Sequence, residues 1–395
     1  MIKRKKKNKE HNPFYDPTLK KRHVSAKRFK KFTLTSLIFS VAFLAFFLFD
    51  MIGKGIPAFN IAYIKVDVTF NEKTLEDTRF AVPTAYRNLV SRAALRDLPK
   101  LLEENPTYMN STQNIWILAS SQVDQYIKNH NHNLKDKDIA KVDELYAQGL
   151  IDKKFNAIFF ENGDSKIPEY AGIFSAVIGS ILTLIITMAV AFPIGVMTAI
   201  YLEEFAGDNK FTRFIEININ NLAAIPSILF GLLGLAIFIN LFGMPRSSPL
   251  VGGLTLALMT LPIIIVSSRA ALRAVPDSIR QAGYGLGLNK IQVTRDHVLP
   301  LAFPGIMTGS IIGLAQAMGE TAPLIIIGMI AFIPDAPSMV TQAATVMPAQ
   351  LFTWAGMPEG MYIEKTAAGI LVLLTILISL NAIAIFLRKK FEVKW

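Results

Sequence analysis

Residues 269–300 read RAALRAVPDSIRQAGYGLGLNKIQVTRDHVLP, and this stretch decides the fold. It is polar, basic and punctuated by glycine, and it lies between two runs that are apolar enough to cross a membrane. Connections between packed helices are usually short. A connection of this length, with a helical pattern of its own, therefore predicts a docking surface rather than a simple turn.

A short amphipathic helix is predicted within this loop. Four apolar residues recur at steps of three and four, which places them on one helix face. They are Val275, Ile279, Ala282 and Leu286. Asp277 follows Pro276 near the start, and a carboxylate is favourable at the positive end of a helix. Glycines at 283, 285 and 287 then end or bend the helix. The alternative is a tilted interfacial helix that joins two spans and binds nothing.

The loop resembles the cytoplasmic loop of binding-protein-dependent ABC importer permeases, which has the pattern E-A-A-x3-G-x9-I-x-L-P. The matching positions here are Gln281, Ala282, Gly283, Gly287, His297, Leu299 and Pro300. The departures are Gln281 for Glu, Gly283 for the second Ala and His297 for Ile. In that family the loop forms the coupling helices that sit in a groove of the ATPase subunit. The resemblance implies that role for this loop, including Asp277 and Arg280.

Composition indicates a membrane protein without thiol chemistry. Of the 395 residues, 52% are hydrophobic and 18% are charged, which is less charge than a soluble protein of this size usually carries. The absence of cysteine excludes disulfides, thiolate catalysis and thiolate metal sites. The one close pair of histidines, His130 and His132, fits a solvated loop better than a metal site. No metal site is predicted.

The basic character of the chain comes from its N-terminal arm. Residues 1–31 hold thirteen Lys and Arg against Glu10 and Asp16, and the whole chain has a net charge of +11. A basic arm can bind nucleic acid. This arm runs straight into an apolar span, which instead favours anionic lipid, worth about 1 kcal/mol per basic residue near the surface. Membrane lipid is therefore the predicted partner, and nucleic acid is not.

Six membrane helices are predicted. The first, 32–52, has the length needed to cross a hydrocarbon core about 30 Å thick. No small-x-small cleavage site follows it, so we interpret it as an anchor and not as a signal peptide. The other five spans are predicted at about 171–202, 222–242, 250–268, 301–333 and 367–387.

The distribution of basic residues predicts the orientation. The arm 1–31, the loop 269–296 and the C-terminus contain thirteen, five and four basic residues, and they lie on one side of a six-span chain. The two short loops opposite contain one each, Arg246 and Lys365. Because basic loops stay inside, both termini are expected in the cytoplasm.

Residues 53–170 predict a small α+β domain on the extracytoplasmic side, inserted between the first two membrane helices. No segment in this range is apolar enough to span. Alternation and helical spacing predict strands at 64–70, 114–120 and 155–160, a helical stretch at 84–103 with a break at Pro99, and a helix at 136–150. No catalytic constellation appears in the domain. A partner-docking role and a purely structural role both remain open.

One charged residue stands inside an apolar run. The stretch 313–324 reads GLAQAMGETAPL, and Glu320 lies within the predicted fifth span. A charge there costs about 2.5 to 3.5 kcal/mol on insertion scales, so such residues usually face a bundle interior or a water-filled path. Gln316 is one turn earlier and Thr321 is adjacent, and the three predict a translocation pathway. The alternative is a carboxyl group that only ties two helices together.

The segments 319–324 (GETAPL) and 274–280 (AVPDSIR) resemble the phosphate-specific ABC permeases, and the likeness covers about 170–390. Related phosphate permeases often have Arg one turn before this Glu, where Gln316 stands here. The resemblance implies an all-α polytopic fold of six transmembrane helices with an ABC importer permease core. It also implies three kinds of partner: a second homologous permease, two ATPase subunits and an extracytoplasmic phosphate-binding protein.

The chain contains no Gly-x4-Gly-Lys-Ser/Thr phosphate loop, so ATP hydrolysis by that route must come from a partner. A transport subunit of the bacterial inner membrane is expected, without a cofactor of its own and without an enzymatic site. Two alternatives remain. One is a permease for sulfate, molybdate or a polyamine, and the other is a membrane receptor that senses a ligand through 53–170. A receptor needs a signalling domain inside, and no predicted cytoplasmic segment is long enough.

Overall fold

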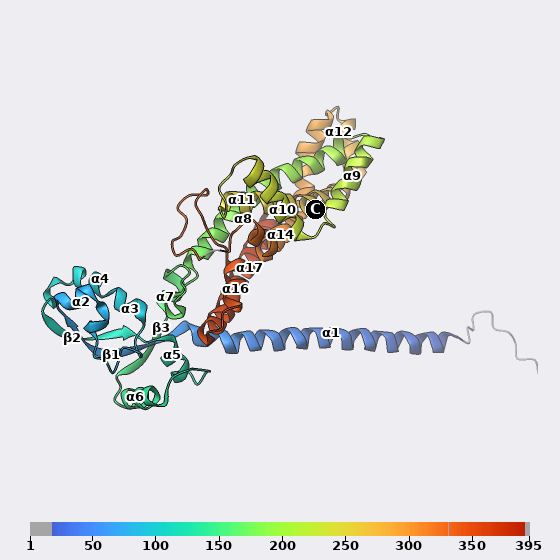
Figure 1. Cartoon of the computed structure of the whole chain (residues 1–395). Coiled ribbons are helices and arrows are strands. Elements are labelled where there is room, and N and C mark those ends of the chain that lie inside the picture. The colour runs from blue at the N-terminus through green and yellow to red at the C-terminus, as the bar shows by residue number, and fades with distance from the viewer. Residues whose placement is uncertain (1–17, 331, 392–395) are drawn as a thin grey trace, which may run out of the picture. The chain divides into compact units, whose positions relative to one another are not determined.

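The computed structural model describes residues 18–330 and 332–391 (Figure 1). Within this part of the chain, five helices are long and apolar enough to cross a membrane, and a sharply bent helix pair is a sixth candidate. The chain divides into two compact units, residues 1–53 and 54–395. The second unit contains both the inserted α+β domain and the main helix bundle.

The first unit consists of the helix α1, Leu19–Gly55. The helix is continuous through the described half of the basic arm and through the predicted span 32–52, while residues 1–17 lie outside the described residues. Its apolar side chains are exposed along the whole span. The Thr33 and Thr35 hydroxyls donate to main-chain carbonyls of the preceding turn, at 3.0 and 2.9 Å. A helix in lipid requires hydrogen-bonded polar groups and exposed apolar side chains, and α1 has both.

A three-stranded antiparallel sheet forms the centre of the inserted domain. The strands are β1 (Asn60–Phe70), β2 (Ser111–Leu118) and β3 (Ile151–Phe155), in the order β2-β1-β3. Alternate residues of β1, among them Ile64 and Val66, point into an apolar core. Short helices cover that core. They are α2 (Glu72–Glu76), α3 (Arg92–Arg96), α4 (Leu98–Glu104), α5 (Ser121–Ile127) and α6 (Asp136–Ala147).

One local prediction in this domain was wrong, and another was confirmed. The predicted strand 155–160 is mostly the helix α7 (Ala157–Glu161), because the Asn156 side chain caps it by accepting from the Phe159 main-chain N–H at 3.2 Å. The break predicted near Pro99 is confirmed, because the helical part of 84–103 consists of two short helices, α3 and α4, which meet at Asp97. Pro99 lies in the first turn of α4, where its missing N–H breaks no hydrogen bond.

The bundle is built on the pair α8 (Phe174–Ile200) and α11 (Pro249–Arg273). Their backbones approach closely at Gly253, where an added Cβ would lie 2.6 Å from the Ile186 Cβ. The Thr187 hydroxyl contacts the Gly253 carbonyl at 3.2 Å and donates to its own helix at 2.9 Å. Small residues and hydroxyls at a helix contact are typical of membrane bundles, where van der Waals packing and not the hydrophobic effect drives association.

Other spans differ in their boundaries from the sequence predictions. The predicted span 301–333 ends early, because α14 (Leu299–Gly319) is followed by a break and by the short helix α15 (Ala322–Ile326). The last helix, α17 (Gly360–Phe391), begins before the predicted span 367–387. Between α15 and α17 lies the helix α16 (Met347–Ala355).

Residues 203–221, which connect the predicted spans 171–202 and 222–242, are largely helical. This part of the chain forms a π-turn at Tyr201–Phe205 and the helix α9 (Lys210–Leu222). α10 (Ser227–Gly234) continues as a π-helical segment to Leu241, and it lies at 104° to α9. In Figure 1, α9 and α12 (Asp277–Gly285) lie at one end of the bundle, and α7 and α16 lie toward the other.

Buried charges join the inserted domain to the start of α17. Gln125 and Lys128 donate to the two carboxylate oxygens of Glu364 at 2.7 and 3.1 Å, and the His130 ring contacts the same carboxylate. Lys128 also pairs with Asp124 at 2.6 Å. Burial raises the pKa of Asp124 despite the neighbouring ammonium. Charges this deeply buried hold α5 against α17, since separating one partner leaves an uncompensated charge.

Removing the Glu364 carboxylate should loosen this junction. We expect Glu364→Ala to lower the free energy of unfolding by about 3–5 kcal/mol, because Lys128 would stay buried with less compensation. The measurement is thermal unfolding of the detergent-purified protein, together with protease susceptibility of residues 54–170. Glu144→Ala, which removes an exposed pair on α6, is the control. Equal behaviour of the two variants would show that the buried cluster does not hold the domain.

Candidate functional site

The helix α12 and the chain that follows it form the best-defined surface site. α12 begins at Asp277, directly after Pro276, and its last turn ends at a glycine in the left-handed region, Gly287 with φ +79°. The Leu288 main-chain N–H closes the turn by donating to the Gly283 carbonyl at 3.2 Å. A side chain at 287 would strain this turn, so glycine is required by the backbone.

Gly283 has a packing reason for being glycine. It is buried, and an added Cβ would lie 2.8 Å from a γ-methyl of Val293, in the short helix α13 (Lys290–Val293). Alanine here would push Val293 away and separate the two halves of the loop. The departure from the second Ala of the importer pattern therefore follows from the closeness of α12 to α13.

Arg280 fixes α12 to the rest of the bundle. Its Nη2 donates to Glu204 Oε1 at 2.6 Å and to the Leu272 carbonyl at 3.0 Å, and its Nη1 donates to the Val275 carbonyl at 2.8 Å. The Glu204 side chain, at the end of α8, is only 5% exposed. The hydrogen bond that Arg280 donates to this carboxylate raises the pKa of Arg280. Arg280 thus points inward and positions α12, and it does not lie on the exposed face of that helix.

A second ion-pair group holds three helices together near this loop. Arg269 of α11 pairs with Glu216 of α9 at 2.5 Å and with Glu203 at 3.3 Å. Arg273 pairs with Glu203 at 2.6 Å. Sequence reasoning did not find these acidic partners, because an isolated Glu at a helix end gives no pattern that identifies its partner.

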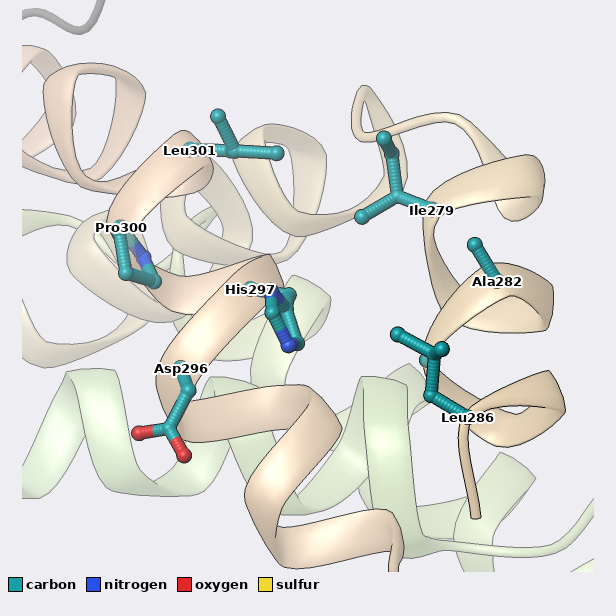
Figure 2. Close-up of a pocket in the computed structure, with 8 residues that line it drawn as sticks. Ile279, Ala282, Leu286, Asp296, His297, Pro300 and Leu301 are labelled. Carbon is teal, nitrogen blue, oxygen red and sulfur yellow. The ribbon is translucent and has the colours of Figure 1, made fainter. Parts of the chain in front are cut away.

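A groove separates α12 from the start of α14 (Figure 2). Its volume is about 310 Å³, and it is lined by residues of α12 on one side and of the π-turn Thr294–Val298 and α14 on the other. The lining residues are Ile279, Ala282, Gly283, Leu286, Asp296, His297, Pro300 and Leu301. The chain folds back so that both ends of the importer pattern, Ala282 and Pro300, share one groove.

The exposed side of α12 completes the surface. The side chain of Asp277 is 86% exposed and Leu286 is 80% exposed. Gln281 and Tyr284 are also exposed, whereas Leu299, the first residue of α14, is half-buried. An exposed leucine and tyrosine beside an apolar groove are typical of a surface that another protein covers.

The three predicted pathway residues lie at a helix break. α14 ends at Gly319, and Glu320 has an extended backbone with φ −77° and ψ 128°. The expectation that Glu320 stands in mid-helix was therefore wrong. Pro323 explains the break, because its ring would clash with the Gly319 carbonyl and it has no N–H to donate. Sequence reasoning did not use this proline.

Gln316, Glu320 and Thr321 are close in the sequence, and the structure shows no hydrogen bond between their side chains. Gln316 is exposed, and Glu320 and Thr321 are half-buried. Among residues 18–330 and 332–391, the Glu320 carboxylate has no hydrogen-bond or ion-pair partner. Nothing in that part of the chain supports the alternative in which this carboxyl ties two helices together.

Metal binding finds no support in the part of the chain that the structure describes. No three His, Asp or Glu side chains there lie close enough together to hold an ion. His130 and His132 are in a loop, as predicted. His130 contacts Glu364, and the His132 ring packs edge-on against the Tyr126 ring at 4.9 Å.

Comparison with protein families gives two matches. Residues 191–393 match the family described as the binding-protein-dependent transport system inner membrane component. This range contains α9, α12, the groove and the Glu320 break. Residues 16–85 and 81–136 match a domain of unknown function, which covers α1 and much of the inserted domain.

The chain is also similar to individual proteins of bacterial phosphate transport systems. The phosphate transport system permease protein PstA of Mycobacterium leprae is 36% identical over 160 residues, 40% of this chain and 52% of that protein. PstA of Yersinia pestis is 31% identical over 245 residues, 61% of this chain and 81% of that protein. The chain spans about half the length of the first of these relatives. A solved inward-facing MetNI methionine ABC transporter chain has 14% identity and a TM-score of 0.44, and the match covers 56% of this chain and 95% of that one.

The inward-pointing role of Arg280 can be tested directly. We expect Arg280→Ala to leave Glu204 buried without its main partner and to release α12, since breaking a buried pair costs about 3–5 kcal/mol. The measurement is main-chain hydrogen exchange across residues 277–288, which should speed up at least tenfold. Arg295→Ala, which removes an exposed arginine paired only with its neighbour Asp296, is the control. Identical exchange in the two variants would contradict the anchoring role.

Proposed function

The chain belongs to the family of binding-protein-dependent transport system inner membrane components, and we propose that it is a permease subunit of an ATP-driven importer of inorganic phosphate. As a family member it is a multi-pass permease of ABC importers and a transport subunit. Phosphate is the substrate named for the PstA relatives, which are 31–36% identical. The single observation that carries the proposal is the family match across the bundle, the groove and α12.

An ATPase subunit would dock on the face formed by α12 and the groove. Leu286 and Tyr284 supply exposed apolar contacts, and Gln281 and Asp277 supply polar ones. Gly283 and Gly287 shape the helix and its turn, and Arg280 holds it in place from inside. ATP is then bound by the partner, and this chain needs no cofactor of its own.

Docking on α12 would transmit force to the bundle. Arg280 bonds Glu204 at the end of α8 and the Leu272 carbonyl of α11, and these are the two most extensively packed helices. A movement of α12 driven by closure of two ATPase subunits would therefore move the α8–α11 pair as one body. Rigid-body movement of packed helices is a common means of alternating access.

The proposed orientation places α12 and both termini in the cytoplasm of the bacterium, and the inserted domain outside the inner membrane. The bias of basic residues supports it. A phosphate-binding protein would then deliver substrate on the side of the inserted domain. A second homologous permease would supply the other half of the pathway.

Glu320, with Gln316 and Thr321, would line that pathway. Irregular backbone at membrane depth is tolerated where protein buries it or where it lines a water-filled cavity. The helix break at Glu320, and the lack of a partner for its carboxylate in residues 18–330 and 332–391, support the second situation. A protonated carboxyl there can donate a hydrogen bond to a phosphate oxygen.

Uptake of labelled phosphate tests the substrate. The chain is expressed with a second permease, an ATPase and a binding protein in cells that lack their own high-affinity system. We expect ATP-dependent uptake that disappears when this chain is omitted and persists in excess sulfate or molybdate. Competition by either anion, or no phosphate uptake although the ATPase still co-purifies, would reject phosphate and keep the permease assignment.

The same assay tests Glu320. We expect Glu320→Ala to reduce uptake at least tenfold while the protein remains in the membrane and keeps the ATPase bound. Glu144→Gln, on the far inserted domain, is the matched removal of a carboxylate and should transport normally. Wild-type uptake by Glu320→Ala would remove this residue from the pathway.

A further inference from the structure

The helix α9 does not follow the direction of the spans. It runs from Lys210 to Leu222, and its first turn is capped by Asn209, which accepts from the Phe211 and Thr212 main-chain N–H groups at 3.0 and 2.9 Å. The angle between α9 and the following α10 segment is 104°. If the apolar α10 segment crosses the bilayer, α9 lies close to the bilayer plane.

One side of α9 is occupied by the protein itself. Ile219 is buried and Ile215 is half-buried, in the same apolar cluster as Leu272 of α11. Glu216, on this side of the helix, pairs with Arg269 of α11 at 2.5 Å. The inner side of α9 is therefore fully used and is fixed to the bundle.

The adjoining side is exposed and mainly apolar, and its one polar residue, Asn218, donates to the Phe214 carbonyl at 2.7 Å. Phe211 is 71% exposed and Phe214 is 64% exposed, and Leu222 follows on the same side at helical spacing. Arg213 and Asn220 are exposed on the opposite side. The exposed apolar surface continues onto α10 through Ile228, Leu229 and Leu232. Leaving these two phenylalanine side chains in water instead of burying them would cost about 1.5–3 kcal/mol of transfer free energy each.

We propose that α9 is an interfacial helix embedded in the phospholipid leaflet on the side of α12. Phe211 and Phe214 enter the boundary between headgroups and acyl chains, about 5–10 Å deep. Lys210 and Arg213 lie at the level of the lipid phosphates. Arg213 has only the exposed Asp208 nearby, at 3.7 Å, and Lys210 adds a second positive charge to this short segment. Charge and apolar surface together fit a phospholipid surface.

This contact would set the height of the docking site relative to the membrane. Glu216 ties α9 to Arg269 of α11, and α11 leads directly into the turn before α12. A helix held in the headgroup layer thus fixes the end of α11 from which α12 projects. The inference depends on the membrane location of the chain and is independent of the transported substrate.

The chain has no cysteine, which permits single-site labelling of α9. We would place one cysteine at a time along 210–222, attach a nitroxide and reconstitute the assembled importer with cysteine-free partners in phospholipid nanodiscs. Collision rates with oxygen and with a water-soluble nickel complex give the depth of each label. The label at Phe214→Cys should collide more often with oxygen. The label at Asn220→Cys, on the opposite side, should collide more often with the nickel complex. Depth should oscillate with the helical period around the headgroup level.

Three results would overturn the proposal. A depth that increases steadily from 210 to 222 would make α9 part of a span. A label at 214 that neither reagent reaches would mean that a protein partner covers this side. Preference for nickel at both 214 and 220 would place the helix in water. Labels at Phe211 and Leu222 repeat the measurement if the change at Phe214 impairs assembly, and normal phosphate uptake would not rescue the inference.

Discussion

The buried ion pair between Arg280 and Glu204 determines where α12 can be. A carboxylate that is 5% exposed is costly unless it is paired, and the guanidinium uses its other N–H groups on the main chain of α11 and of the turn that follows it. α12 is consequently an extension of the α8–α11 pair rather than a loose loop between spans. The groove beside it has a defined shape because the walls on both sides are held by the same bundle.

Hydropathy located most of the long helices because lipid permits few alternatives to a continuous helix. It gave no signal for α9, whose three asparagines lower its apolar content and whose burial depends on α11, a contact that lies outside any local window. The break after Gly319 was hidden for a different reason. The flanking residues are apolar enough to extend the predicted span, and only Pro323 marks the end of the helix.

The sequence predicted which residues belong to the loop 269–300, but it could not predict which of their side chains point inward. Arg280 is grouped with exposed residues by its place in the motif, whereas its partner Glu204 lies 76 positions earlier. Gly283 appears as a departure from a pattern until the nearby Val293 explains it. Local spacing predicts which residues share a helix face, and tertiary contacts decide which face is inside.

The inserted domain begins and ends at adjacent points. Asn60 at the start of β1 lies opposite Phe155 at the end of β3 across an antiparallel pair, and the domain has an apolar core of its own. A module whose two ends are adjacent can be gained, lost or exchanged between neighbouring helices without rethreading either one. The extra domain and the bundle can thus diverge at different rates wherever they do not touch, and a chimaera would have to keep the buried contact of Gln125 and Lys128 with Glu364.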